Sequence, residues 1–215
     1  EVLLSVRAYD RVSDSIVELT KADCSFAYRT SIFNTIDQGR YIVLRVSYSL
    51  VRDGRPALRY PDVRRAFEGR AEPSLREVRE AVRRIRAGKA MLLVEGDPDC
   101  RSAGSFFKNP ILTEREFAEL QAAIPNDPVP RYPAGPGKVK TAAAWLIERA
   151  GFAKGHSIGA VGISTKHTLA LVNKGGASAE DLLRLAREIR VRVFDRFGVT
   201  LMPEPVFLGF ERGSF

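Results

Sequence analysis

Residues 41–51 read YIVLRVSYSLV, and this stretch decides the fold class of the first part of the chain. Apolar side chains recur there at every second position, at Ile42, Leu44, Val46, Tyr48 and Leu50. Arg45, Ser47 and Ser49 occupy positions between them. An apolar period of two over this length predicts a half-buried β-strand with the five apolar side chains on one face.

Strand patterns also precede this stretch. Residues 2–9 and 15–19 flank a polar turn at 10–14, which predicts a β-hairpin. The chain opens directly on the first of these strands, at Glu1, with neither an initiating methionine nor a secretion signal. We therefore expect a further segment upstream of residue 1.

Helical patterns dominate after residue 60. The pairs Ser74/Glu77 and Thr113/Glu116 have the spacing of capping boxes, and apolar residues at helical spacing follow each of them. Helices are predicted to begin at Ser74, Thr113, Val139 and Ser178. Short strands are expected at 160–163, 169–172, 199–201 and 206–208, and a proline-rich loop at 125–137. These elements together predict an α+β fold.

The composition limits the classes of protein to which this chain can belong. The 215 residues include 34 Lys and Arg against 26 Asp and Glu, a net charge of +8, and 45% of them are hydrophobic. These values exclude a disordered chain, and no apolar run is long enough for a transmembrane helix. The charge indicates an anionic partner. Two distant cysteines and two histidines match no familiar zinc spacing, so we expect reduced thiols and no metal.

The segment 64–89 carries nine basic residues against four acidic ones, which is +5 of the total charge. Most of its arginines fit the solvent face of one amphipathic helix. Arg86 and Lys89 lie at the end of that helix, where cations either complement the helix dipole or hold a phosphate or carboxylate. Phe67 is the only aromatic residue within the segment, which argues against a nucleic-acid interface.

Three stretches offer groups for chemistry. Residues 102–110, SAGSFFKNP, place a hydroxyl, a cation and an amide within five positions, at Ser105, Lys108 and Asn109; an ordinary turn has the same composition. Arg29 lies in FAYRTSIF, where an arginine is either paired in a core or directed at an anion. Glu204 lies between two prolines that restrict its backbone, so it is a rigid acid or an exposed loop residue. No phosphate-loop or dinucleotide-binding fingerprint is present.

Four stretches in this order resemble the UDP-N-acetylenolpyruvoylglucosamine reductase family (MurB, also called UDP-N-acetylmuramate dehydrogenase). They are 28–33 (YRTSIF), 102–110 (SAGSFFKNP), 140–147 (KTAAAWLI) and 203–207 (PEPVF). The resemblance covers nearly the whole chain and the latter part of the family's chain. It implies the remaining part of an FAD-binding domain at 1–91 and a smaller α+β substrate-binding domain at 92–198. Residues 199–215 are implied to return to the flavin site as strands.

The resemblance implies reduction of the enolpyruvyl group of UDP-N-acetylenolpyruvoylglucosamine to UDP-N-acetylmuramate, a step of peptidoglycan synthesis. NADPH reduces a bound FAD, and the flavin passes hydride to the double bond. By position, Ser105 is implied to protonate the resulting carbanionic carbon, and Arg29 and Glu204 to stabilise the enolate-like intermediate. The family implies a cytoplasmic monomer that binds a UDP-sugar, but neither nucleic acid nor membrane.

Further positions are implied to contact the ligands. The substrate contacts are Tyr60, Lys89, Asn109, Tyr132, Lys140 and Lys154, and the flavin contacts are Tyr28, Ser31 and Arg86. Most of the FAD site is expected upstream of residue 1. Met202 departs from the family pattern, in which a glutamate is usual. Two alternatives remain: a UDP-sugar-binding fragment without redox chemistry, and a basic α+β nucleic-acid-binding module.

Overall fold

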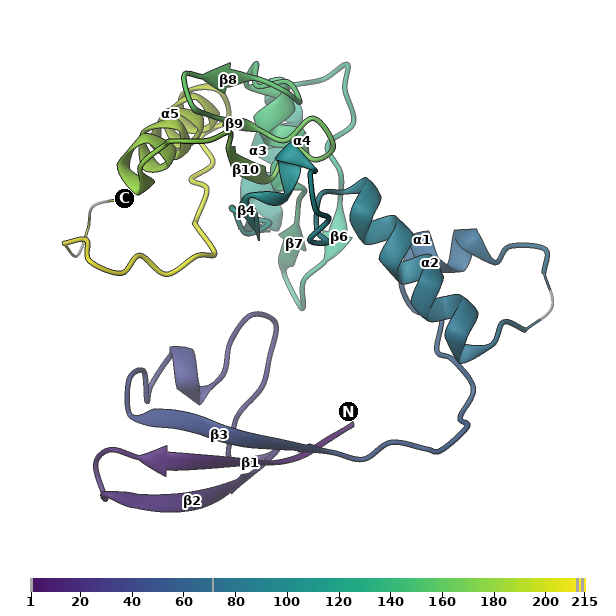
Figure 1. Cartoon of the computed structure of the whole chain (residues 1–215). Coiled ribbons are helices and arrows are strands. Elements are labelled where there is room, and N and C mark those ends of the chain that lie inside the picture. Colours follow the sequence, from purple (N-terminus) through teal and green to yellow (C-terminus); the bar gives the residue numbers. More distant parts are fainter. Residues whose placement is uncertain (1, 71, 212, 214) are drawn as a thin grey trace. The chain divides into compact units, whose positions relative to one another are not determined.

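The computed structural model describes residues 2–70, 72–211, 213 and 215, and the chain divides into two compact units (Figure 1). Unit 1 comprises Glu1–Ala57 and Pro73–Leu75, and unit 2 comprises Leu58–Glu72 and Arg76–Phe215. Helices and antiparallel sheets are both present, so the predicted α+β class is confirmed. The functional boundaries expected near residues 91 and 198 stay a prediction.

Unit 1 is built on a three-stranded antiparallel sheet in the order β2–β1–β3. Strands β1 (Leu3–Asp10) and β2 (Ser15–Thr20) form the predicted hairpin, and β3 (Tyr41–Tyr48) pairs with the other edge of β1. A short 3-10 helix, η1 (Ile32–Asn34), lies in the connection between β2 and β3.

Strand β3 forms as predicted, but its apolar residues do not share one face. Val46 lies opposite Val6 and Val43 opposite Ala8, with a register shift between the two pairs. Directly opposed residues lie on the same face of an antiparallel pair, so this β-bulge turns Ile42 away from the face of Val46. The prediction of a single apolar face is therefore wrong, because a strict period of two cannot detect an inserted residue.

An ion pair fixes the end of this sheet. Asp10 is 2% exposed and accepts from Nε and Nη2 of Arg40 at 3.0 and 2.7 Å, and from the Val12 backbone N–H at 2.9 Å. The Arg40 guanidinium is the main cause that holds the pKa of Asp10 well below its usual range, and burial opposes it. The hairpin turn and the start of β3 are thus joined through one carboxylate.

We expect unit 1 to lose stability in acid through Asp10. Because folding lowers the pKa of Asp10, its contribution is present above the unfolded-state pKa of about 3.9 and is lost as the pH falls through the folded-state pKa. Asp10→Asn should lower stability at neutral pH and flatten this acid dependence. Hydrogen exchange of the β1–β3 amides, corrected for intrinsic rates, measures both effects. An acid dependence that survives the substitution unchanged would contradict this assignment.

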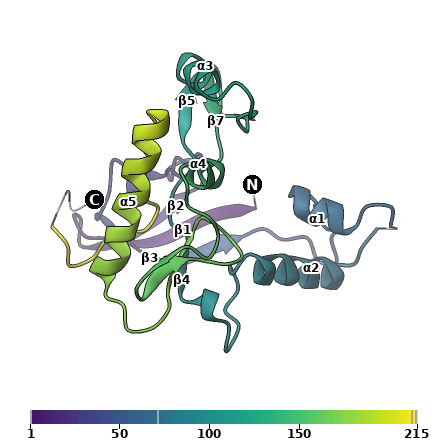
Figure 2. The same cartoon turned by 90° about the horizontal axis from the view of Figure 1, so that it is seen from above.

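Unit 2 holds the main hydrophobic core. Its larger sheet has the antiparallel order β4–β10–β9–β8, with β4 (Ser102–Ser105), β8 (Ser157–Ile158), β9 (Val161–Ile163) and β10 (Ala170–Asn173). Helix α5 (Ala179–Phe197) packs against β9, β10 and helix α4 (Ala143–Arg149), as Figures 1 and 2 show. The sequence predicts an apolar stripe on α5 at Leu182, Leu185, Ala186, Ile189, Val193 and Phe197. All of these residues are buried except Leu182, which is partly buried against the core.

A second sheet of unit 2 has the order β5–β7–β6. Its strands are β5 (Ile111–Thr113), β6 (Tyr132–Pro133) and β7 (Lys138–Lys140), and β5 and β7 contact helix α3 (Glu114–Ala123). The predicted capping box of Thr113 and Glu116 begins α3, and a further one at Ser178 begins α5. Gly198, with a φ of +66°, ends α5 in the left-handed conformation that glycine favours.

Three predicted elements are wrong: the start of one helix and two strands near the C-terminus. Helix α4 begins at Ala143 rather than at Val139, because Val139 is the buried centre of β7. The described residues of 199–201 and 206–208 form no strand, and this segment pairs only through a bridge between Phe107 and Pro203. Pro203 and Pro205 lack the N–H donors that a longer ladder requires.

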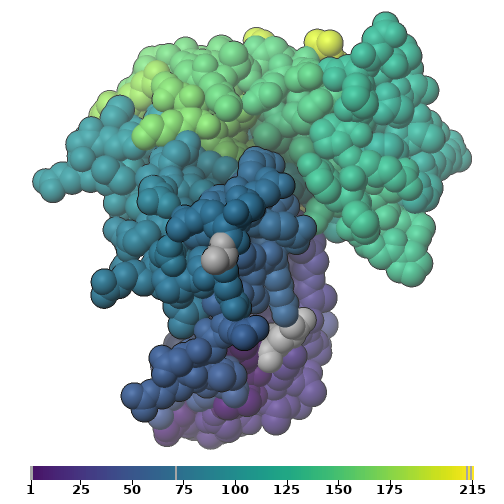
Figure 3. All heavy atoms as spheres, turned by 90° about the vertical axis from the view of Figure 1, so that its right-hand side faces the viewer, coloured from purple at the N-terminus to yellow at the C-terminus, as the bar shows by residue number. Residues whose placement is uncertain are grey.

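The basic segment of unit 2 contains helices α1 (Pro61–Ala66) and α2 (Leu75–Gly88), followed by the 3-10 helix η2 (Pro98–Cys100). Figure 3 shows side chains of this blue part of the chain standing out from the surface. Several of the arginines are paired: Arg70 with Glu77, and Arg79 and Arg83 with Glu80. Across the residues described, no helix is long and apolar enough to cross a membrane.

One hydroxyl group in unit 2 is buried without a partner. Thr141 is fully buried, and its Oγ1 has no hydrogen-bond partner among the described residues. Thr141→Val keeps the side-chain shape and removes the desolvated hydroxyl, so we expect the free energy of unfolding to rise by about 1 kcal/mol. Chemical denaturation followed by the fluorescence of Trp145 measures this change.

Thr168→Val is the matched control. Thr168 is also buried, but its hydroxyl donates to Glu148. The same substitution there leaves a carboxylate oxygen without its donor and should lower the free energy of unfolding by about 1–3 kcal/mol. Changes of the same sign in the two variants would contradict the distinction between the two hydroxyls.

Candidate functional site

Ser105 is the last residue of β4 and follows a β-bulge. Ser105 lies opposite Ala170 and Ser102 opposite Val172, so β4 has one residue more than β10 between these pairs. Gly104, inside the bulge, has a φ of +77°, a conformation that L side chains disfavour. Bulges re-aim the side chains beside them, and this one sets the direction of the half-buried Ser105.

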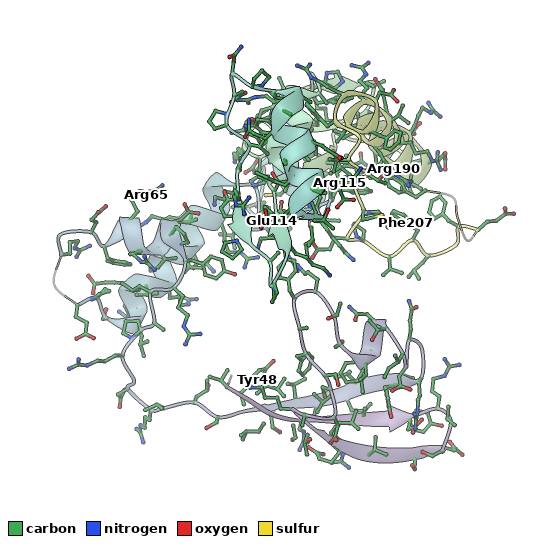
Figure 4. The ribbon with its side chains drawn as sticks, turned by 180° about the vertical axis from the view of Figure 1, so that it is seen from behind. Tyr48, Arg65, Glu114, Arg115, Arg190 and Phe207 are labelled. Atoms are coloured by element: carbon green, nitrogen blue, oxygen red, sulfur yellow. The ribbon has the colours of Figure 1, made fainter. Side chains whose placement is uncertain are left out.

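The two phenylalanines after Ser105 anchor the end of β4 in the core. Phe106 and Phe107 are 3% and 1% exposed, and their rings meet edge to face with centroids 5.1 Å apart. The ring of Phe207 stacks on Phe106 at 6.2 Å, and Phe215 lies 6.1 Å from both anchors. Figure 4 shows Phe207 on the yellow C-terminal segment that supplies these contacts. The phenylalanine pair therefore anchors the end of β4 in the core of unit 2.

Backbone hydrogen bonds place Glu204 opposite Phe106, the residue after Ser105. The Phe106 N–H donates to the Leu169 carbonyl at 2.8 Å, and the Phe106 carbonyl accepts from the Glu204 N–H at 2.8 Å. The Lys108 N–H donates to the Met202 carbonyl at 2.9 Å, next to the bridge between Phe107 and Pro203. A half-buried hydroxyl and a half-buried carboxylate are thus held on neighbouring backbone segments.

A substitution of Gly104 tests how much the β-bulge before Ser105 depends on its positive φ. A Cβ at Gly104 meets no atom within 4 Å, so Gly104→Ala adds backbone strain and no clash. We expect it to lower the free energy of unfolding by about 1–2 kcal/mol. Gly88→Ala is the matched control, because Gly88 also has open space but lies in α2 without a positive φ. The control should be neutral or stabilising by about 0.5–1 kcal/mol in the same denaturation experiment, and equal losses would contradict this reasoning.

Lys140 and Tyr132 lie in the second sheet of unit 2, and Asn109 precedes its strand β5. Tyr132 and Lys140 are directly paired across β6 and β7, so their side chains lie on one face. The Asn109 side-chain oxygen accepts from the Ala143 N–H at 3.0 Å and thereby caps α4 from outside the helix. This bond uses the oxygen of the Asn109 side chain, whose amide NH₂ group is a hydrogen-bond donor.

Two of the remaining predicted substrate contacts, Lys89 and Lys154, act electrostatically on His167. Lys89 pairs with Asp62 on α1. Tyr60 lies directly before this helix, and its side chain is exposed. Burial is the main cause that lowers the pKa of His167, and Lys89 and Lys154 lower it further. Two of the predicted substrate lysines therefore act on the same imidazole through their charge.

The predicted flavin contacts serve local structure as well. In unit 1, Tyr28 and Arg29 form the centre of a turn closed by Ala27 and Thr30, and Arg29 has a φ of +58°. Ser31 begins η1 in a capping box with Asn34. In unit 2, the Arg86 Nε donates to the Met91 carbonyl at 3.0 Å, just past the end of α2.

Two further observations concern residues outside the predicted site. Both cysteines are free thiols, and in the described part of the chain no three His, Cys, Asp or Glu side chains are grouped to hold a metal ion. His167 is absent from the predicted site residues. Its only signal is a histidine in a small polar turn, STKHT, between two apolar strands.

Part of this chain matches a known protein family. Residues 97–208 match the family model described as UDP-N-acetylenolpyruvoylglucosamine reductase, C-terminal domain. The chain belongs to this family. The match includes Ser105, Asn109, Lys140 and Glu204, so three of the four stretches quoted from the sequence lie within the shared domain, and the stretch 28–33 lies outside it.

Several relatives carry the name UDP-N-acetylenolpyruvoylglucosamine reductase. The protein of Thermobifida fusca is 50% identical over 97% of this chain and 60% of its own length. The proteins of Streptomyces coelicolor and Mycobacterium tuberculosis are 50% and 45% identical over 96% and 97% of this chain, and over 56% and 59% of their own lengths. The chain thus spans somewhat over half the length of these relatives.

A solved structure supports the fold. The crystal structure of the MurB reductase from Thermus caldophilus matches 94% of this chain and 52% of that protein, with a TM-score of 0.52 at 23% sequence identity. At this identity the likeness concerns the arrangement of helices and strands.

Proposed function

We propose that this chain is the substrate-binding part, with part of the flavin site, of a cytoplasmic UDP-N-acetylenolpyruvoylglucosamine reductase. The observation that carries the proposal is the pairing of Phe106 with Leu169 on one side and with Glu204 on the other. This pairing holds the hydroxyl of Ser105 and the carboxylate of Glu204 on adjacent segments. The reaction converts the enolpyruvyl ether of a UDP-sugar into UDP-N-acetylmuramate for peptidoglycan synthesis.

The division of roles follows from where charge develops. Hydride addition to a double bond next to a carboxylate places negative charge on the neighbouring carbon and spreads it over the carboxylate. Ser105 donates the proton of its hydroxyl to that carbon and regains a proton from solvent. Glu204, in unit 2, stabilises the enolate-like charge, and the family resemblance implies the same role for Arg29, in unit 1.

Ser105 requires tight positioning for this step. A serine hydroxyl is a weak acid, so it protonates only a strongly basic carbon held close to it in the correct direction. The bulge at Gly104 and the buried anchor Phe106 support such positioning, because they fix the residues on both sides of Ser105.

The ligand-binding side chains suit anionic ligands. Lys89, Lys140 and Lys154 supply ammonium groups for the diphosphate of a UDP-sugar, and Asn109 supplies amide N–H donors. FAD, reduced by NADPH, supplies the hydride when bound. Three groups of this chain would contact FAD. They are the exposed ring of Tyr28, the hydroxyl of Ser31 and the guanidinium of Arg86. An aromatic ring packs on a flavin ring, and a guanidinium suits its carbonyl or phosphate oxygens, so these residues fit the group.

Ser105→Ala in the protein that includes the upstream region tests the proposal. We expect NADPH to reduce the flavin at an unchanged rate, because Ser105 takes no part in that step. Reoxidation of the flavin by the enolpyruvyl substrate should slow by about 10²–10⁴-fold, the usual contribution of a positioned general acid. Stopped-flow absorbance of the flavin measures both half-reactions.

Ser102→Ala is the control on the same strand. The Ser102 hydroxyl accepts from the Gly104 N–H at 3.3 Å and has no proposed part in the chemistry, so both half-reactions should keep their rates within a small factor. Undiminished substrate reduction in Ser105→Ala would refute the proton-donor role.

A further inference from the structure

His167 lies on a turn that is rigidly built. The Ser164 N–H donates to the Ala170 carbonyl at 2.8 Å, and the Ala170 N–H donates to the His167 carbonyl at 3.0 Å. The hydroxyl oxygen of Ser164 accepts from the backbone N–H groups of Lys166 and His167 at 3.0 and 3.3 Å. The backbone of His167 therefore has little freedom.

The side chains on either side of His167 are held in other contacts. The Lys166 ammonium pairs with Asp97, and the Thr168 hydroxyl donates to Glu148. The turn thus presents the imidazole of His167 rather than the groups next to it in sequence.

One hydrogen bond fixes the tautomer of this imidazole. The Leu169 N–H donates to Nδ1 of His167 at 3.1 Å. Since Nδ1 accepts, the neutral ring carries its proton on Nε2 and offers that N–H to a ligand. Burial, with Lys89 and Lys154, lowers the pKa of His167 against the opposing effect of Glu148, which keeps the ring neutral at pH 7.

The turn is also tied to the loop of Lys154 and to the strand of Ser105. Next to Lys154, the Gly155 N–H is shared between the carbonyls of Ile163 and Ser164, each at 3.2 Å. On the other side, the Leu169 carbonyl accepts from the Phe106 N–H, the residue after Ser105. His167 therefore lies between a predicted substrate lysine and the predicted proton donor.

We propose that His167 binds the substrate, with its Nε2–H donating to a phosphate oxygen of the diphosphate held by Lys89 and Lys154. This inference rests on the proposed function. A diphosphate has more acceptor oxygens than two ammonium groups satisfy, and a neutral donor adds a hydrogen bond without a third repelling cation in the free protein.

The assignment has a consequence for pH. A bound diphosphate faces His167 with negative charge and therefore raises the pKa of the imidazole. By linkage, the ligand binds more tightly as the pH falls toward that raised pKa. UDP-N-acetylglucosamine is the suitable probe, because its diester phosphates do not titrate in this range.

Nuclear magnetic resonance of the chain labelled with ¹⁵N-histidine tests the contact directly. The sequence contains only two histidines, His156 and His167, so both can be followed. Saturating UDP-N-acetylglucosamine should shift the Nε2 resonance of His167 and raise its pKa, while His156 stays unchanged. A His167 that does not respond while the ligand is bound overturns the inference.

Calorimetry with His167→Asn provides the second arm. The asparagine side-chain oxygen can accept from the N–H two residues on, so the turn is kept while the Nε2 donor is removed. We expect the Kd for UDP-N-acetylglucosamine to rise about tenfold, as for loss of a hydrogen bond to a charged group, and its pH dependence to flatten. Lys166→Gln, on the same turn, should change the Kd by no more than about threefold.

The outcomes separate the two proposals. An unchanged Kd in His167→Asn overturns the role of His167 and leaves the proposed function standing. A chain that does not bind UDP-N-acetylglucosamine at all overturns both. Weakened binding in His167→Asn with a normal Lys166→Gln supports the inference.

Discussion

The backbone of Phe106 joins two distant segments of unit 2 to strand β4. Its N–H is bonded to Leu169 at the start of the larger sheet, and its carbonyl is bonded to Glu204 in the C-terminal segment. Pro203 and Pro205 have no N–H, so Glu204 is the only residue of these three that can make such a bond. The side chain of Phe106 is buried at the same point, which ties the ladder to the core. The orientations of Ser105 and Glu204 follow from these bonds together.

Local features of the fold could be predicted from the sequence. The caps at Thr113 and Ser178 and the stripe of α5 depend on residues three or four positions apart, and all of them form as expected. Features that depend on distant partners could not be predicted. Val139 joins a strand because Leu112 lies opposite it, and the bulge in β3 arises from its register with β1. Neither partner is visible from the residues beside them.

The candidate site also has features that could be predicted from the sequence and features that could not. The motifs locate Ser105, Asn109 and Glu204, but their proximity comes from pairing between residues about one hundred positions apart. Asn109 shows how one side chain serves two purposes, since its oxygen caps α4 while its amide group stays available as a donor. His167 was missed because its surroundings are set by Lys89 and Lys154, which are distant in sequence and carry no joint pattern. Its identity as a histidine becomes informative only once these lysines are seen beside it.

Met202 is a position whose side chain can change while its backbone contact is kept. The family resemblance implies a glutamate at this position, yet the contact that the residue makes in the ladder is through its backbone carbonyl, which accepts from the Lys108 N–H. Its side chain is 56% exposed. A position that contributes its main chain can exchange an acid for a thioether without disturbing the ladder. The side chain at this position therefore sets the charge beside Glu204, while its backbone carbonyl holds the register of the ladder.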